Sequence, residues 1–321
     1  MTTKFQALIL AVLIVISVAA ANIGGSESKN TSPSEEKSAP PKVSEGLSFE
    51  RASLFAASAP NLSQYEVKKA PERNWEVLDP TLGAAAVLIQ SLDGDFPFFH
   101  LNTYKSWPLA SLTKLLAAVV VIENIGENKK VVVDETAVAT EGEAGNLKSG
   151  EVYTARDLLK VMLLTSSNDA AAAFENYLGR DEFVKLMNEK LRELGLTQTK
   201  VYGASGLEDE NVGTASDILR LVKYILENEP QIFNWTRQKS QLIQPLNDAT
   251  SRTILNINGM VDETGFLGGK TGTSDKARQN EVAIFSSGGE RLILIILGSS
   301  DRDKEIKNLL DWIGRAYTFP S

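Results

Sequence analysis

The sequence predicts an α+β fold: an antiparallel sheet built from both chain ends, flanked by helices, with an inserted helical lobe. Two observations lead to this prediction. Apolar runs of strand length lie near residues 84–101 and again near residues 280–298, whereas apolar patterns of helix length fill the stretch between them. The 321 residues are 43% hydrophobic and 23% charged, which is enough apolar material for a sizeable core.

The expected strands form two hairpins. Asp93-Gly94 is a turn signal between the first two strands, and Gly288-Gly289 is a stronger signal between the last two. A glycine-rich stretch at residues 268–273 is expected at a strand edge. The strands of the hairpins are expected at residues 84–92, 95–101, 280–287 and 290–298.

Capping signals place the helices. Thr154 and Thr214 each begin a capping-box pattern, in which an acidic residue follows three positions later. Gly179 and Gly195 each follow a helical pattern and are typical of C-terminal caps. Helices are expected at residues 111–123, 154–165, 170–177, 180–194, 214–228 and 301–317.

The N-terminus is a separate segment. Lys4 precedes an apolar run from Ala7 to Ala21, which as a helix would span roughly 22 Å, against about 30 Å for a hydrocarbon core. The positive start and the small residues at its end fit a secretory signal peptide. A retained membrane anchor over residues 5–23, roughly 28 Å long, fits almost as well, and a buried core helix is less favoured. Both favoured interpretations of residues 1–23 predict export.

The chain after the apolar run divides into three parts. Residues 24–48 are rich in Ser, Pro, Glu and Lys, and we expect them to be a disordered tether. Residues 49–79 contain scattered Leu, Phe, Tyr and Trp and are expected to pack onto the domain that follows. Residues 80–321 carry the globular pattern, so one domain is expected there.

Composition excludes several kinds of chemistry. The chain has no cysteine, so a catalytic thiol, a disulfide and a lipid-modified cysteine are excluded. A single histidine cannot supply a zinc site, and a Ser-His-Asp triad would have to use His100, which is expected to be a sheet residue. The 33 basic and 41 acidic residues give a net charge of −8, which argues against nucleic acid as a partner.

Without a usable cysteine or histidine, lysine is the remaining base for a hydroxyl nucleophile. Ser111 and Lys114 stand three positions apart at the start of an apolar helix, where they share a face and meet free backbone N–H groups. The spacing alone is weak, since Ser-x-x-Lys also occurs twice in residues 24–48. The alternative interpretation is an N-cap serine beside a surface lysine.

A lysine base needs a lowered pKa. At pH 7 an ordinary lysine is neutral only about once in 2,500 molecules, a deficit of roughly 4.6 kcal/mol. Burial and a second cation both lower this pKa, and Lys270 is the candidate second cation. The motif Lys270-Thr271-Gly272 occurs once, is followed by Thr273, and offers a lysine and two hydroxyls to a substrate carboxylate. The alternative is a glycine-rich turn with a surface lysine.

A third polar cluster lies at the junction of two expected helices. Ser166 can relay a proton there, and the side-chain amide of Asn168 can hold a peptide carbonyl. The alternative is an N-cap serine that links two helices.

Ser-x-x-Lys, Ser-x-Asn and Lys-Thr-Gly, taken in this order, form a highly specific set. With them the sequence resembles the penicillin-recognising serine acyltransferases, and among these the serine-type D-alanyl-D-alanine carboxypeptidases. The resemblance covers about residues 80 to 317 and implies a β-lactamase/transpeptidase-like fold. Further similar stretches are Ala-Ser-Leu-Thr-Lys-Leu at 110–115, Gly-Glu-Val-Tyr-Thr at 150–154, Ser-Asn-Asp-Ala-Ala at 167–171 and Thr-Ala-Ser-Asp at 214–217.

The resemblance implies roles for the site residues. Ser111 would attack the carbonyl of the penultimate D-alanine and form an acyl-enzyme, and Lys114 would take its proton. Ser166 would pass a proton to the leaving D-alanine, and Asn168 would hold the substrate peptide. The residues implied for the terminal carboxylate are Lys270, Thr271, Gly272 and Thr273. Backbone N–H groups of Ser111 and Thr273 would form the oxyanion hole, and no metal or organic cofactor is required.

The resemblance also implies where the enzyme works. Its substrates would be peptidoglycan stem peptides ending in D-Ala-D-Ala, and β-lactams would be covalent inhibitors. The enzyme would be exported to the periplasm or to the outer face of the cytoplasmic membrane. Many family members continue into a β-rich domain and an amphipathic C-terminal anchor, whereas this chain stops at Ser321. Membrane attachment is therefore expected only through the N-terminus.

Three alternatives stay open. Activity on cross-linked wall, as a DD-endopeptidase, fits the same residues. A class A-like β-lactamase would need a deacylating Glu-x-x-x-Asn pattern, but Glu208 and Asn211 are one residue too close. A non-catalytic wall-binding protein would have no need of both lysines. Arg302 can add positive charge near the carboxylate, although a solvated arginine at a helix start is the favoured interpretation.

Overall fold

The computed structural model describes residues 69–142 and 144–320. The expected signal peptide or anchor (1–23), the tether (24–48) and the first part of the segment 49–79 lie outside the described residues. Within the described part of the chain, no helix is both long and apolar enough to cross a membrane.

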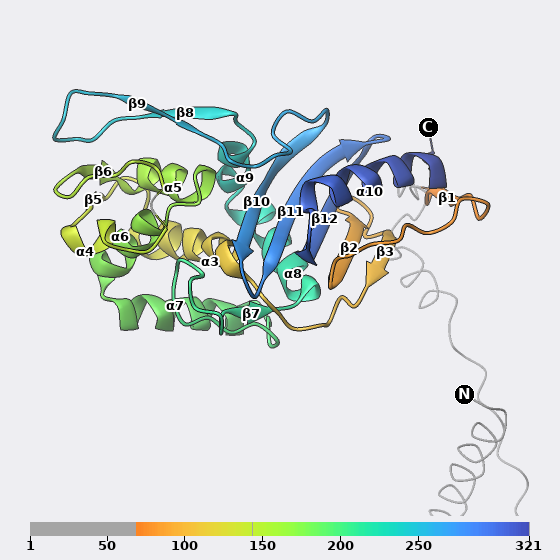
Figure 1. Cartoon of the computed structure of the whole chain (residues 1–321), viewed down its shortest axis with the longest axis horizontal. Helices are drawn as coiled ribbons and strands as arrows, with labels where there is room; N and C mark the ends of the chain where they lie inside the picture. Colours follow the sequence, from red (N-terminus) through yellow and green to blue (C-terminus); the bar gives the residue numbers. More distant parts are fainter. Residues whose placement is uncertain (1–68, 143, 321) are drawn as a thin grey trace, which may run out of the picture. The chain divides into compact units, whose positions relative to one another are not determined.

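The expected antiparallel sheet is present and joins both ends of the described chain (Figure 1). Its strands are β2 (Ala86–Ser91), β3 (Pro97–Leu101), β10 (Phe266–Ser274), β11 (Arg278–Ser287) and β12 (Glu290–Ser299). They follow the order β10-β11-β12-β2-β3, and every neighbouring pair is antiparallel. The two ends of the chain meet where β12 pairs with β2, with Ile295 opposite Leu88.

Gly288 and Gly289 form the turn between β11 and β12. Both have positive φ, 60° and 79°. Positive φ at both central residues is what a two-residue type I′ turn requires. The hairpin predicted from these two glycines is therefore confirmed.

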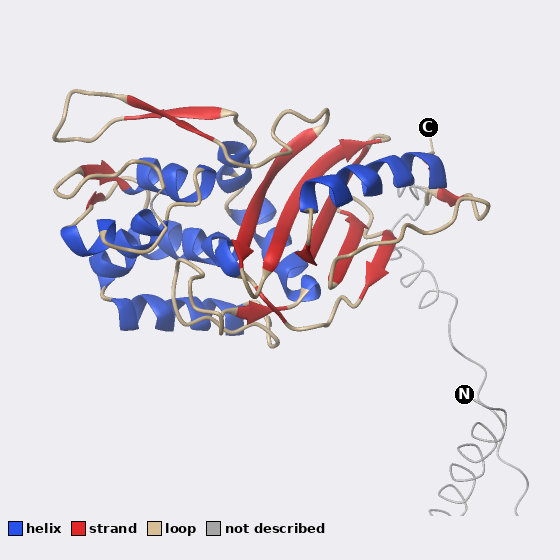
Figure 2. Cartoon of the chain, viewed as in Figure 1, coloured by secondary structure: helices blue, strands red, loops and turns tan. Residues whose placement is uncertain are grey.

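Alternate side chains of the sheet enter two different cores. On β2, Leu88 joins the larger core with the helical lobe, whereas Val87 and Ile89 pack with the C-terminal helix α10 (Arg302–Ala316). Trp312 of α10 is buried in this second core. Helices thus cover both faces of the sheet, as the predicted fold class requires (Figure 2).

The helical lobe contains the expected helices, some with shifted starts. They are α3 (Thr113–Val120), α5 (Ala155–Leu164), α6 (Asn168–Leu178), α7 (Arg180–Glu193) and α8 (Ala215–Asn228). Thr154 and Thr214 cap α5 and α8, each accepting a hydrogen bond of 3.1 Å from the backbone N–H three positions later. α6 begins two residues earlier than expected because Ser167 caps it, accepting from the Ala170 N–H at 3.1 Å.

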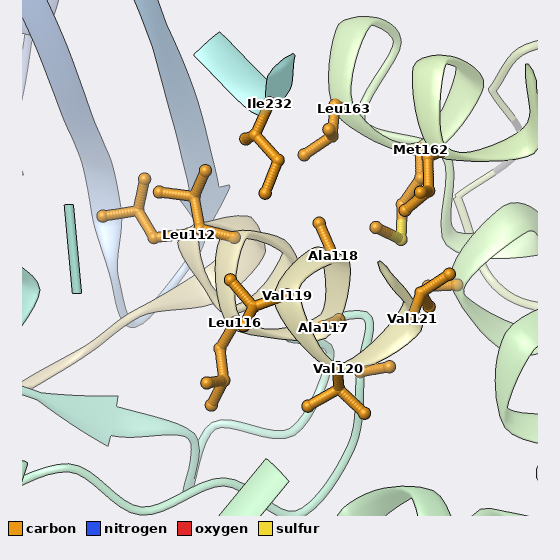
Figure 3. Packing of buried hydrophobic residues seen from close by; sticks show 14 of the residues in the cluster. Leu112, Leu116, Ala117, Ala118, Val119, Val120, Val121, Met162, Leu163 and Ile232 are labelled. Atoms are coloured by element: carbon orange, nitrogen blue, oxygen red, sulfur yellow. The ribbon is translucent and has the colours of Figure 1, made fainter. Parts of the chain in front are cut away.

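α3 runs through the centre of the lobe, and all eight of its residues are buried. Figure 3 shows its neighbours, among them Met162 and Leu163 of α5 and Ile232 of the short helix α9 (Gln231–Thr236). A helix enclosed in this way can bury a charged side chain such as Lys114 only where polar partners are supplied.

The helix expected at residues 111–123 consists of three pieces. A 3-10 turn, η2 (Ala110–Leu112), precedes α3, and a π-helical turn, η3 (Val121–Ile125), follows it. Several elements too short to show a periodic pattern are also present. They are α4 (Glu135–Val138) and the strand pairs β1 (Glu72–Arg73) with β13 (Tyr317–Thr318), β4 (Trp107–Pro108) with β7 (Val212–Gly213), β5 (Lys130–Val132) with β6 (Val152–Thr154), and β8 (Ser240–Ile243) with β9 (Arg252–Leu255).

Residues 72–78 contact the C-terminal helix and the short strand that follows it. β1 pairs with β13. The Arg73 guanidinium lies 5.2 Å from the ring centroid of Trp312 and 5.3 Å from that of Tyr317. Contacts of this kind are attractive because the ring faces carry partial negative charge.

The Thr154→Ala variant is expected to lower the free energy of unfolding by about 1 kcal/mol, because the first turn of α5 loses its side-chain acceptor. Urea unfolding measures the change. Thr197→Ala, at an exposed threonine, is the control and should stay within about 0.5 kcal/mol of wild type. Equal losses in the two variants would contradict the capping role.

Candidate active site

Ser111 lies where three segments of the chain converge. It belongs to η2, and the preceding Ala110 has a φ of 47°, which is unusual for a residue with a Cβ. A Cβ on Gly206 would overlap the Ala110 carbonyl oxygen, and one on Gly272 would lie 3.2 Å from the Ser111 nitrogen. Glycine at these two positions therefore lets both segments reach the backbone of the serine turn.

Ser111 and Lys114 are in contact. Lys114 Nζ lies 3.0 Å from Ser111 Oγ, and it donates to Asn168 Oδ1 (2.7 Å) and to the Ser205 carbonyl (2.6 Å). The lysine is fully buried rather than at the surface. Burial lowers the pKa of Lys114 to about 7, and the Glu208 carboxylate opposes this shift. Near neutral pH the amine can therefore accept a proton from the serine hydroxyl.

Lys270 is a second buried lysine, and it faces Ser166. Its Nζ lies 2.8 Å from Ser166 Oγ and 2.7 Å from the Thr271 carbonyl. Burial holds the pKa of Lys270 well below its usual range, and the positive charges of Lys114 and Arg302 lower it further. Burial, and not the charge of Lys270, is therefore what lowers the pKa of Lys114, whereas the charge of Lys114 lowers the pKa of Lys270.

Ser166 and Asn168 come from the junction between α5 and α6. Ser166 has a φ of 60°, in the left-handed region, and Asn168 is the first residue of α6. The Asn168 side chain joins two parts of the site, because Oδ1 accepts from Lys114 and Nδ2 donates to the Glu141 carbonyl at 2.7 Å. Both residues of the Ser-x-Asn motif therefore contact a buried lysine.

The Lys-Thr-Gly motif lies on β10, which packs beside η2. Arg302, the first residue of α10, reaches this strand: Nη1 donates to Thr273 Oγ1 (2.7 Å) and to the Gly272 carbonyl (3.2 Å). The Arg302 side chain is only 15% exposed, so its interpretation as a solvated arginine is wrong. Its position directly after the last strand of the sheet was the sequence signal that could have placed it here.

Two other candidates from the sequence are engaged elsewhere. His100 lies on β3, at the opposite edge of the sheet from β10, and is a sheet residue as expected. Glu208 forms an ion pair with Arg180, and Asn211 Nδ2 donates to the Gly203 carbonyl (3.0 Å). Glu208 and Asn211 therefore hold the loop that carries the Ser205 carbonyl.

Comparisons with known proteins identify the family of the chain. A sequence model of the family described as D-alanyl-D-alanine carboxypeptidase matches residues 81–301. The D-alanyl-D-alanine carboxypeptidase DacB2 of Mycobacterium tuberculosis is 32% identical over 216 residues, 64% of this chain and 73% of that protein. A D-alanyl-D-alanine endopeptidase of Pseudomonas aeruginosa is 37% identical over 150 residues, 45% of this chain and 48% of that protein.

Solved structures share the fold. The crystal structure of a D-alanyl-D-alanine carboxypeptidase from Mycobacterium tuberculosis has a TM-score of 0.69 and 28% sequence identity, and covers 78% of this chain and 99% of that one. The transpeptidase-like α+β fold predicted from the sequence is thereby confirmed. The chain belongs to the D-alanyl-D-alanine carboxypeptidase family of serine peptidases.

Proposed function

We propose that the protein is a serine DD-carboxypeptidase that removes the terminal D-alanine from peptidoglycan stem peptides through an acyl-enzyme on Ser111. The observation that carries this proposal is the 3.0 Å contact between Ser111 Oγ and the buried amine of Lys114. A lysine with a pKa of about 7 is a competent base at neutral pH. Family membership supports the reaction class, and this contact supports the assignment of nucleophile and base.

Acylation begins when neutral Lys114 takes the Ser111 proton and Oγ attacks the carbonyl carbon of the penultimate D-alanine. The carbonyl oxygen becomes negative, and backbone N–H groups of Ser111 and Thr273 are assigned to bind it. The C–N bond then breaks. The leaving nitrogen takes a proton through Ser166, whose hydroxyl contacts Lys270.

Deacylation restores the serine. Water attacks the ester carbonyl, and Ser111 Oγ leaves as the hydroxyl while the shortened peptide departs with a new carboxylate. Asn168 is assigned to hold the peptide part of the substrate during both steps, since its amide lies within the same hydrogen-bond network as Lys114.

The cationic end of the site is assigned to the terminal carboxylate of the substrate. The residues expected there are Lys270, Thr271, Gly272 and Thr273. Arg302 joins them through its contact with the Thr273 hydroxyl. A guanidinium matches a carboxylate in shape as well as charge, which supports its inclusion.

The proposal extends to inhibitors, place of action and a second activity. β-Lactams would acylate Ser111 as substrate mimics. Peptidoglycan lies outside the cytoplasm, so residues 1–23 are assigned to export, and to membrane attachment where they are retained. DD-endopeptidase activity on cross-linked wall is favoured by the similarity to the Pseudomonas aeruginosa endopeptidase.

Intact-mass measurement after incubation with penicillin tests the acyl-enzyme on the full-length protein. We expect one adduct per chain in the wild type and none in Ser111→Ala. Ser34→Ala is the matched control, because Ser34 stands in the same Ser-x-x-Lys spacing, and it should keep the adduct. A wild type without an adduct, or an adduct that survives Ser111→Ala, would overturn the proposal.

Product analysis separates the remaining alternatives. Release of D-alanine from a pentapeptide ending in D-Ala-D-Ala, together with a long-lived penicillin adduct, supports the carboxypeptidase. Rapid turnover of penicillin would indicate a β-lactamase. An adduct with no cleavage of either the pentapeptide or a cross-linked peptide dimer would indicate a wall-binding protein.

A further inference from the structure

Glu281 is a buried carboxylate that the proposed mechanism does not use. It lies on β11, opposite Thr271 of β10, and has no exposed surface. Neither of its oxygens accepts a hydrogen bond of ordinary geometry from any described residue. Burying a glutamate is costly unless it is protonated or faces a cation, so this side chain calls for an explanation.

Arg302 connects Glu281 to the proposed carboxylate site. Its Nε lies 3.7 Å from Glu281 Oε2 and 3.5 Å from Asp303 Oδ1. The other edge of the guanidinium faces β10, where Nη1 donates to Thr273 Oγ1 and to the Gly272 carbonyl. The guanidinium therefore lies between the acidic side chains of Glu281 and Asp303 on one edge and the Lys-Thr-Gly strand on the other.

We infer that Glu281 is a positioning residue for Arg302, and that its charge state sets how strongly the guanidinium attracts the terminal carboxylate of the substrate. Glu281 acts through Arg302 and touches no substrate itself. The inference rests on the proposed function, because it needs a substrate that ends in a carboxylate beside Thr273.

The groups that face Glu281 come from three parts of the chain. Burial is the largest influence and favours the protonated form, as does the Asp303 carboxylate, whereas Arg302, the Asn258 amide and Lys270 favour the charged form. The balance raises the pKa of Glu281 to about 8. Glu281 is therefore neutral in mildly acidic and neutral solution and negative in alkaline solution.

This titration gives substrate binding a defined pH dependence. While Glu281 is neutral, it does not offset the positive charge of Arg302, and an anionic substrate is attracted. Once Glu281 ionises, its charge offsets that of Arg302 and the attraction weakens. Lys114, with a pKa of about 7, is already a base in this range. KM should therefore rise in alkaline solution, whereas kcat should stay nearly constant.

The Glu281→Gln variant tests this inference, because it keeps the side-chain shape and an oxygen acceptor but loses the charge. kcat and KM for D-alanine release from a pentapeptide ending in D-Ala-D-Ala are measured separately from pH 6 to pH 10. We expect the wild-type KM to rise at least about fivefold between pH 7 and pH 9.5, and the variant KM to stay within about twofold. Glu290→Gln, at another buried glutamate of the same sheet, should follow the wild type.

A pentapeptide ending in a carboxamide provides a second readout, because it offers no negative charge to Arg302. Its KM should show no alkaline rise that depends on Glu281. An alkaline rise that persists in Glu281→Gln would assign the effect to another group, such as Lys270, and overturn the inference. A variant KM raised equally at every pH would also overturn it. If the Glu281→Gln variant does not fold, the Glu281→Met variant replaces it. Methionine is neutral and similar in size, so the same KM profile is expected.

Penicillin acylation separates this inference from the proposed function. Suppose that penicillin acylates Ser111 fully in both the wild type and Glu281→Gln, and that KM depends on pH in the same way in both. This result would contradict the role of Glu281 but leave the proposed function intact. A wild type that is not acylated would contradict the proposed function itself.

Discussion

The Lys114→Met variant is expected to be acylated by penicillin about 10²- to 10⁴-fold more slowly than the wild type, because the group that takes the Ser111 proton is missing. Methionine fills a similar volume but cannot accept a proton. The growth of the adduct mass with time measures the rate. Lys190→Met is the matched control, since Lys190 is 9% exposed and pairs with Glu123 at 2.6 Å. Its acylation rate should equal that of the wild type.

The pH dependence of acylation identifies Lys114 as the base. Only the neutral amine accepts a proton, so the wild-type rate at saturating penicillin should rise with pH and level off above a midpoint of about 7, the pKa of Lys114. The Glu208 carboxylate raises this pKa, and Glu208→Gln should therefore move the midpoint to lower pH. A midpoint near the ordinary lysine value of 10.5, or a Lys114→Met variant as fast as the wild type, would refute the assignment.

The Gly206→Ala variant is expected to lose at least about 10²-fold in acylation rate, because a small displacement of a catalytic group costs this much. Gly206 has a φ of 83°, and an added Cβ would overlap the Ala110 carbonyl oxygen, next to Ser111. The left-handed backbone costs an alanine about 1–2 kcal/mol, and the overlap adds about 1–3 kcal/mol. The turn that carries Ser111 must therefore shift.

The Gly179→Ala variant separates backbone strain from displacement. Gly179 has a φ of 87°, but no described atom beyond its immediate neighbours in the chain lies within 4 Å of its Cβ position. Urea unfolding should show a loss of stability in both variants, and the acylation assay should show a loss of rate only in Gly206→Ala. Equal acylation rates would mean that the close approach at Gly206 is not needed to hold the Ser111 turn.

The central sheet and the capped helices could be predicted because their signals are local. Gly288 and Gly289 adopt the positive φ angles of a tight turn without help from distant residues, and Thr154 caps the helix that follows it directly. The β8–β9 hairpin could not be predicted in this way. It turns Leu242 and Leu255 outward, 65% and 66% exposed, so its strands lack the alternation of buried apolar and exposed polar residues.

The site could be predicted as a set of residue types but not as a geometry. Helical spacing alone places Ser111 near Lys114. The contact between Lys270 and Ser166 joins residues 104 positions apart, and it depends on how the sheet packs against the lobe. Arg302 was misinterpreted for the same reason: a helix start usually faces water, and only tertiary packing brings this one to β10.

The pairing of β2 with β12 also determines when during folding the enzyme becomes reactive. Aligning Leu88 with Ile295 closes a loop of roughly 200 residues, and contacts so distant in sequence form slowly because the loop entropy must be lost first. The ribosome makes Ser111 and Lys114 long before β12. In the sheet, β10 is joined to β2 only through β11 and β12, so we expect the capacity to react with penicillin to appear only after β12 has entered the sheet.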